Sequence, residues 1–249
     1  MLEMKGKKAP MSNPQFVLVH GAWHGAWCWD EIVSRLERRG YRALAPDLSG
    51  LGSRAAGTDL DSIGLLTHVA DVVEVLRNAE SPVVLVGHSY AGMVATSAAG
   101  QVPEKVAKLV IVDGFVPEAG EKAVELLPEH VAAHYREFAE ASGYVDMAPR
   151  PVKNLGVTDQ AVIDAVESRL TPHPAMTYFE AAETGASEVE APAEYIVCSG
   201  WSSPFVAGKG RAEKLGWTVR DIEADHEVML TNPELLTDYL VEAAKSVAP

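Results

Sequence analysis

The stretch VVLVGHSYAGMVATSAAG, residues 83–100, decides the fold. It begins as an apolar β-branched run typical of a buried strand, and small residues from about Tyr90 to Ala99 indicate a helix. Ser89 lies at the tight turn between them, where we expect a strained, exposed pose facing the first N–H groups of the helix. The common motif is G-x-S-x-G, and Ala91 at its last position is small enough to keep the turn. The pattern predicts a nucleophilic serine, with a helix N-cap serine as the plainer alternative.

Two further features favour a nucleophile. The strand FVLVH, residues 16–20, runs into a small-residue loop, so the N–H of Ala22 is expected to hold an oxyanion together with the N–H of Tyr90. His226 lies between the run WTVRDI, residues 217–222, and the last helix, which suits a general base. A surface loop histidine is the alternative. In combination these features predict Ser89 and His226 as a catalytic pair.

Apolar runs alternate with helical patterns along most of the chain, which predicts a mostly parallel sheet with helices on both faces. The alternation breaks over residues 116–190, where helical stretches and prolines indicate an inserted helical cap. The core is then expected over residues 15–115 and 191–249, and residues 1–14 as a disordered leader with Met11 as an alternative start. Six strands are expected, at about 16–20, 41–46, 83–87, 108–113, 195–199 and 217–222.

Composition narrows the class of function. The chain has 249 residues, with 21 Lys and Arg against 35 Asp and Glu, giving a net charge of −14. Such an acidic surface disfavours nucleic-acid binding, and no basic run suits an anionic membrane. The longest apolar runs fall well below the roughly 20 residues of a membrane helix, and no secretory signal is visible. With only Cys28 and Cys198, a cytoplasmic protein without disulfides is predicted, Cys198 being a buried small hydrophobe.

Four segments together resemble the esterase and hydroxynitrile lyase branch of the α/β-hydrolases. They are HGAWHGAWCW at residues 20–29, APDLSGLGSR at 45–54, GHSYAGM at 87–93 and DHEVML at 225–230, and RLTPHP at 169–174 resembles bacterial members. The resemblance covers nearly the whole chain from Phe16 onward. It implies an α/β-hydrolase fold with a cap and a serine esterase that needs no cofactor or metal.

The same branch contains lyases that cleave cyanohydrins, and three positions separate the two activities. Similar lyases carry a Thr after the first-strand His, a Glu before the nucleophile and a Lys after the catalytic His. Here these positions hold Gly21, His88 and Glu227. An anionic Glu227 would repel cyanide, so the resemblance favours ester hydrolysis.

The triad acid is missing from its usual place in this family. The loop that normally carries it reads SGWSSP, residues 199–204, without a carboxylate. Because losing the acid costs roughly 10⁴ in kcat, we expect it elsewhere. Asp113, at the end of the strand beside the nucleophile strand, is the leading candidate, although a loop-capping role is also open.

Other arrangements of the acid stay open. Asp225 and Asp221 lie close to His226 in the sequence, and a dyad helped by Ser199, Ser202 or water would need no acid. A catalytically inactive member of the family is the last of these alternatives.

The sequence thus predicts a serine hydrolase that cleaves a small to medium carboxylic ester through an acyl-enzyme. The catalytic residues are Ser89, His226 and Asp113, and Trp23, His24 and Trp201 are expected at the substrate pocket. The expected partner is a small-molecule ester. A lyase or carbon–carbon bond-cleaving enzyme and a catalytically weak ligand-binding protein are the alternatives. Neither the particular substrate nor the oligomeric state is predicted.

Overall fold

A computed structural model describes residues 13–247 of the chain, so the predicted leader lies almost entirely outside the described residues. Its centre is a six-stranded sheet in the order β2-β1-β3-β4-β7-β8. Every neighbouring pair of strands in this sheet is parallel. The predicted mostly parallel sheet of about six strands is therefore confirmed. The strands are β1 (Gln15–Val19), β2 (Ala43–Leu44), β3 (Val83–His88), β4 (Val106–Val112), β7 (Ala193–Cys198) and β8 (Thr218–Ile222).

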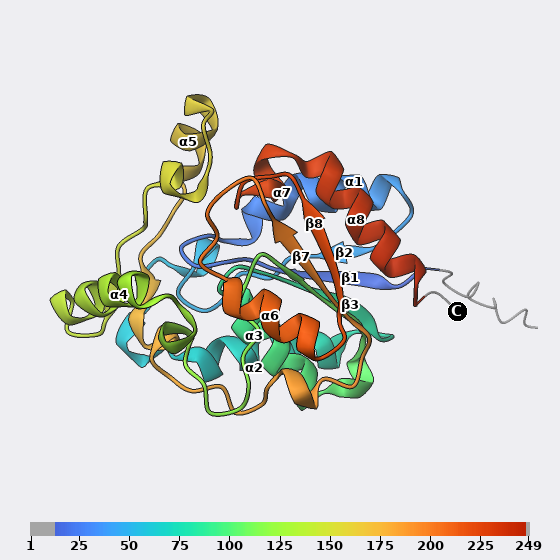
Figure 1. The fold of residues 1–249 in the computed structure, drawn as a ribbon, viewed down its shortest axis with the longest axis horizontal. Helices are drawn as coiled ribbons and strands as arrows, with labels where there is room; N and C mark the ends of the chain where they lie inside the picture. The colour runs from blue at the N-terminus through green and yellow to red at the C-terminus, as the bar shows by residue number, and fades with distance from the viewer. Residues whose placement is uncertain (1–12, 248–249) are drawn as a thin grey trace, which may run out of the picture.

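Helices cover both faces of the sheet, and the strands are apolar on both sides for that reason. One face carries α1 (Asp30–Arg38), α7 (Val228–Thr231) and α8 (Pro233–Lys245), and the other carries α2 (Leu65–Asn78), α3 (Ala91–Gln101) and α6 (Val206–Lys214) (Figure 1). Alternate residues of β1 enter the two cores, Phe16 and Leu18 on the first side and Val17 and Val19 on the second.

The strand that precedes Ser89 is the most enclosed element of the sheet. All six residues of β3 are buried, and β3 pairs with β1 on one side and β4 on the other. Each fully buried Val or Leu contributes roughly 1.5–3 kcal/mol relative to an exposed side chain. The site at the end of β3 therefore stands on a strand that is buried along its whole length.

The second strand is shorter than expected. The sequence pattern predicted it over residues 41–46, but β2 spans only Ala43–Leu44. It is an edge strand with β1 as its one neighbour in the sheet. Past Pro46 the chain turns inward, and the N–H of Leu48 donates to Nε2 of the buried His20 at 3.2 Å.

Residues 116–190 connect β4 to β7 outside the sheet, with α4 (Glu129–Ala141) and α5 (Gln160–Glu167) away from it in Figure 1. We expected no strand here, yet β5 (Asp146–Met147) and β6 (His173–Pro174) form a short antiparallel pair. A two-residue strand leaves too little alternation to detect in a sequence. The boundaries assigned to the cap remain a prediction.

Short 3-10 helices join these elements. They are Ala26–Trp29, Gly52–Arg54, Leu60–Ser62, Pro103–Lys105, Ala123–Leu126, Val152–Leu155, Ala175–Tyr178 and Ala186–Glu188. None of the helices within residues 13–247 has the length and apolar character to cross a bilayer. The cytoplasmic location stays a prediction.

Candidate active site

Ser89 occupies a strained turn between β3 and α3. Its φ is 57°, a left-handed value that residues other than glycine rarely adopt. A Cβ on Gly87 would lie 2.6 Å from the carbonyl oxygen of Ala91, so only glycine fits before the turn. The structure thus has the strain that the sequence pattern predicted. The predicted exposure is wrong, because Ser89 is only 9% exposed, at a cavity lined by residues of the 116–190 segment and of the loop after β7.

His226 links the serine to a carboxylate. Its Nε2 lies 2.9 Å from Oγ of Ser89, and its Nδ1 lies 2.7 Å from Oδ2 of Asp113. The backbone around the ring is held on both sides. The N–H of His226 donates to the carbonyl oxygen of Leu155, and Nε2 of His88 donates to the carbonyl oxygen of His226 at 2.9 Å. The structure therefore brings the three predicted catalytic residues into one hydrogen-bonded chain.

Asp113 reaches His226 because backbone hydrogen bonds join β4 to β3 and to the turn at Ser89. β3 and β4 pair up to His88 and Val112, and Ser89 then donates its N–H to the carbonyl oxygen of Val112. Asp113 itself has a φ of 41°. A Cβ on the following Gly114 would lie 2.5 Å from the carbonyl oxygen of Ser89, so the close approach of the two turns requires glycine.

The loop after β7 contacts the same carboxylate. Trp201 donates its Nε1–H to Oδ2 of Asp113 at 2.8 Å, and Ser203 donates its hydroxyl to Oδ1 at 2.9 Å. The indole of Trp201 also lies 4.7 Å, centroid to centroid, from the ring of His226. The loop after β7, which has no carboxylate of its own, thus supplies two hydrogen-bond donors to the carboxylate of Asp113 at the end of β4.

The other candidate groups for the acid position have different partners. Asp225 accepts hydrogen bonds from the N–H of Glu227 and the hydroxyl of Thr231. Asp221 forms an ion pair with Lys209 at 3.6 Å. The hydroxyl of Ser199 donates to the carbonyl oxygen of Ile222.

The two backbone N–H groups predicted to hold an oxyanion lie in the loop after β1 and directly after Ser89. The N–H of Ala22 follows β1, and the N–H of Tyr90 opens α3 directly after Ser89. Over residues 13–247 neither N–H donates to a protein acceptor. Free donors of this kind suit an oxygen that carries developing negative charge.

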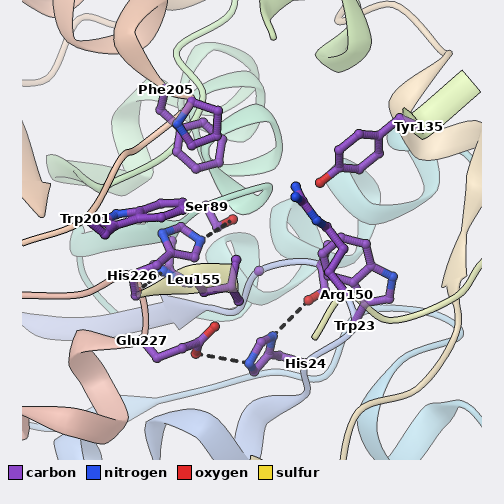
Figure 2. Close-up of a pocket in the computed structure, with 14 residues that line it drawn as sticks. Trp23, His24, Ser89, Tyr135, Arg150, Leu155, Trp201, Phe205, His226 and Glu227 are labelled. Atoms are coloured by element: carbon purple, nitrogen blue, oxygen red, sulfur yellow. Dashed lines mark hydrogen bonds and ion pairs between the residues drawn. The ribbon is translucent and has the colours of Figure 1, made fainter. Parts of the chain in front are cut away.

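A narrow cavity of about 30 Å³ lies over Ser89 and His226. It has room for a water molecule or two. Trp23, His24 and Trp201, all predicted at the substrate pocket, line it together with Tyr135 and Arg150 from the 116–190 segment (Figure 2).

His24 and Glu227 form a buried ion pair in the wall of this cavity. Nε2 of His24 lies 3.1 Å from Oε2 of Glu227. Burial opposes the charged forms, but each charge favours the other, so the pKa of His24 is raised and that of Glu227 is lowered to about 2. The sequence interpretation placed His24 at the pocket without a partner. The charged residue directly after His226 was the available signal.

Both cysteines are fully buried and unpaired, and burial raises their pKa values, which confirms Cys198 as a buried small hydrophobe. Within the part of the chain that the structure describes, no group of three or more His, Cys, Asp and Glu side chains could hold a metal ion.

Comparison with known proteins gives consistent matches. The model of the Alpha/beta hydrolase family matches residues 16–238. A relative named carbendazim hydrolyzing esterase, from Nocardioides sp. (strain SG-4G), is 35% identical over 90% of this chain and 97% of its own length. Methylesterase 7 of Arabidopsis thaliana is 39% identical over 43% of this chain and 42% of its own length.

Solved structures show the same fold. An extracellular alpha/beta-hydrolase from a Paenibacillus species has a TM-score of 0.83 at 23% identity, covering 93% of this chain and 99% of that one. The Arabidopsis methylesterase MES16 has a TM-score of 0.77 at 20% identity, covering 94% and 99%.

Proposed function

Because the chain belongs to the alpha/beta hydrolase family and is a carboxylic ester hydrolase, we propose that it cleaves small to medium esters through an acyl-enzyme on Ser89, with Asp113 as the triad acid. The observation that carries this proposal is the unbroken hydrogen-bonded chain Ser89–His226–Asp113, with 2.9 Å and 2.7 Å between the bonded atoms. The acid comes from the end of β4 in place of the loop after β7.

Acylation follows from these distances. Nε2 of His226 takes the proton of Ser89 while Oγ attacks the ester carbonyl. The N–H groups of Ala22 and Tyr90 hold the oxyanion of the tetrahedral intermediate. When the intermediate collapses, the C–O bond to the alcohol breaks and the alcohol leaves with the proton from Nε2. The acyl group stays on Ser89.

Deacylation reverses these roles. A water molecule gives its proton to Nε2 of His226 and attacks the acyl carbonyl. The second tetrahedral intermediate then releases the carboxylic acid and returns the proton to Oγ of Ser89. Throughout both steps Asp113 accepts the Nδ1–H of His226, which fixes the tautomer and stabilises the imidazolium. Trp201 and Ser203 hold the carboxylate in that position.

The alternatives from the sequence are a lyase and a weakly catalytic binding protein. A cyanohydrin lyase of this branch would place a Lys where this chain has Glu227, and that carboxylate is already paired with His24. The binding protein was suggested by the missing acid alone, and the contact of Asp113 with His226 weakens that reason. The binding protein is one outcome of the following experiment, and rapid release of cyanide from mandelonitrile would instead identify a lyase.

The test is direct trapping of the acyl-enzyme. Purified protein is mixed with p-nitrophenyl acetate, quenched with acid and digested, and the peptide that carries Ser89 is analysed by mass spectrometry. We expect acetylation of Ser89 with release of p-nitrophenol, and neither above background in Ser89→Ala. Turnover of p-nitrophenyl esters without acylation would contradict the mechanism, and failure of a fluorophosphonate to label Ser89 would favour the binding protein. A chain-length series, with carbendazim included because of the relative's name, then bounds the substrate size.

A further inference from the structure

One side of the active-site cavity holds buried polar atoms that have no hydrogen-bond partner among residues 13–247. They are Nδ1 of His88, Nε2 of His24 and both carboxylate oxygens of Glu227. All three residues line the same cavity as Ser89, and all three are almost completely buried, Glu227 being 0% exposed. The 3.1 Å contact between His24 and Glu227 is close enough for an ion pair but is not aligned as a hydrogen bond. Buried polar groups in proteins rarely lack a hydrogen-bond partner.

The hydrogen-bonding state of each atom follows from its surroundings. His88 donates its Nε2–H to the carbonyl oxygen of His226, and burial lowers its pKa to about 3, so its Nδ1 is an acceptor. Glu227 is a carboxylate with acceptor atoms only. His24 donates its Nδ1–H to the carbonyl oxygen of Ala22 at 2.8 Å, and its Nε2 lies 3.1 Å from Oε2 of Glu227. The atoms without a hydrogen-bond partner on this side of the cavity are therefore mainly acceptors.

The position of this cluster ties it to the ester. A Cβ on Gly21 would meet both Nδ1 of His88, at 3.2 Å, and Cβ of Ser89, at 3.0 Å, so the imidazole lies directly beside the nucleophile. Glu227 follows His226 in the chain, and its carboxylate lies beside His24 in the close-up view (Figure 2). Since Glu227, His88 and Ser89 line one cavity, we infer that the group bound by this cluster belongs to the ester attacked by Ser89.

We propose that Glu227 and His88 form an acceptor subsite that binds a hydroxyl or N–H group of the substrate next to its scissile ester. This inference rests on the proposed function and narrows its substrate class to esters that carry such a donor. His24 neutralises Glu227 and so lets a neutral donor bind without leaving a buried charge uncompensated. A site built to accept a hydrogen bond discriminates strongly against analogues that lack the donor, because its acceptors then stay unpaired.

The test uses esters that differ only in the donor. Methyl mandelate is compared with methyl α-fluorophenylacetate, and 2-hydroxyethyl phenylacetate with 2-fluoroethyl phenylacetate. Fluorine has a size and electron withdrawal close to those of a hydroxyl but carries no proton to donate. Each kcat/KM is divided by the rate constant for alkaline hydrolysis of the same ester, which corrects for its intrinsic reactivity. The first pair probes the acyl side and the second the alcohol side. We expect the wild-type enzyme to prefer the hydroxyl member of at least one pair by about tenfold or more.

Two variants locate the preference. Glu227→Gln should reduce the hydroxyl-to-fluoride ratio by about tenfold, because an amide is a weaker acceptor than a carboxylate. Glu223→Gln is the matched control, since Glu223 is exposed on the same loop, and its ratio should equal that of the wild type. The ratio is an internal standard, so a general loss of turnover in Glu227→Gln does not affect it.

The wild-type measurement keeps the test decisive even if Glu227→Gln does not fold. Equal corrected rates within both pairs would overturn the acceptor subsite while leaving the esterase in place, as expected if a water molecule fills the subsite. A preference that survives intact in folded Glu227→Gln would also overturn it. Absence of hydrolysis of every ester, p-nitrophenyl esters included, would instead count against the proposed function.

Discussion

Ser89 and Asp113 both have a left-handed backbone conformation, which residues other than glycine adopt infrequently, with φ values of 57° and 41°. The two strained residues lie at the ends of neighbouring parallel strands, and each turn closes against the other through Gly92, Gly114 and the backbone of Phe115. Strain of about 1–3 kcal/mol per residue persists only where surrounding packing enforces it. The packing here fixes the proposed nucleophile and the proposed acid as one unit.

A prediction about Gly92 tests that coupling. In Gly92→Ala the new Cβ would overlap the backbone of Phe115, so α3 or the Asp113 turn must shift. We expect a loss of about 1–3 kcal/mol in the free energy of unfolding, measured with guanidinium chloride, and a lower kcat. Gly210→Ala is the control, because Gly210 lies in a helix with open space around it and should be neutral or slightly stabilised. Equal stability of the two variants would contradict the coupling.

At this scale much of the site could be predicted from the sequence. Ser89 is marked by its strand–turn–helix pattern, and Asp113 by its place at a strand end beside that turn. The partners of the carboxylate could not be predicted, because Trp201 and Ser203 reach it across about 90 residues of chain through loop geometry that no local pattern encodes. The same holds for the pairing of His24 with Glu227.

At the scale of elements, the loop after β7 contributes hydrogen-bond donors to the proposed site, although it lacks the carboxylate that the family resemblance places there. In place of a carboxylate it presents an indole N–H and a hydroxyl to the carboxylate at the end of β4. β4 and β7 are adjacent and parallel, so their carboxyl ends open onto the same edge of the sheet. An acid can therefore be supplied from either strand with His226 in one position.

Ser203→Ala tests the supporting part of this loop. Removing the hydroxyl leaves Oδ1 of Asp113 without this donor, and hydrogen bonds to charged groups contribute roughly 1.5–3 kcal/mol. We expect kcat to fall by about tenfold with little change in KM, because Ser203 does not line the cavity. Ser202→Ala changes the exposed neighbouring serine and should behave like the wild type. Similar kinetics for the two variants would show that the loop does not position the acid.

At the scale of the whole molecule, the sheet could be predicted because buried parallel strands are continuous apolar runs bounded by helices. β2 and the 116–190 segment were predicted less well. Short 3-10 helices and the two-residue strands β5 and β6 leave no periodic signal, and their form depends on what they pack against.

The buried histidines predict how global stability depends on pH. Burial lowers the pKa values of His20 and His68 to about 4 and of His88 to about 3. An unfolded imidazole has a pKa near 6.5, so below that pH the unfolded chain binds more protons than the folded one. The free energy of unfolding should therefore fall as the pH drops from about 6.5 towards 3, by up to about 1.4 kcal/mol per pH unit for each group. His24, whose pKa is raised, acts in the opposite direction.

Guanidinium unfolding at pH 5 and pH 7 measures this effect. We expect a clearly lower free energy of unfolding at pH 5, and a smaller difference in His68→Gln than in the wild type. His134→Gln, which alters a largely exposed histidine, should leave the difference unchanged. A protein equally stable at both pH values would contradict the neutral, buried state of these imidazoles.

The central claim is that the triad acid is Asp113, and steady-state kinetics of Asp113→Asn on a p-nitrophenyl ester test it most directly. The amide keeps the shape but cannot stabilise the imidazolium or hold the required tautomer of His226, so kcat should fall at least a hundredfold, towards the loss of about 10⁴ known for such triads. Asp225→Asn, which changes the carboxylate beside His226 in the sequence, should keep a kcat close to that of the wild type. An unchanged kcat in folded Asp113→Asn, or a larger loss in Asp225→Asn, would contradict the account.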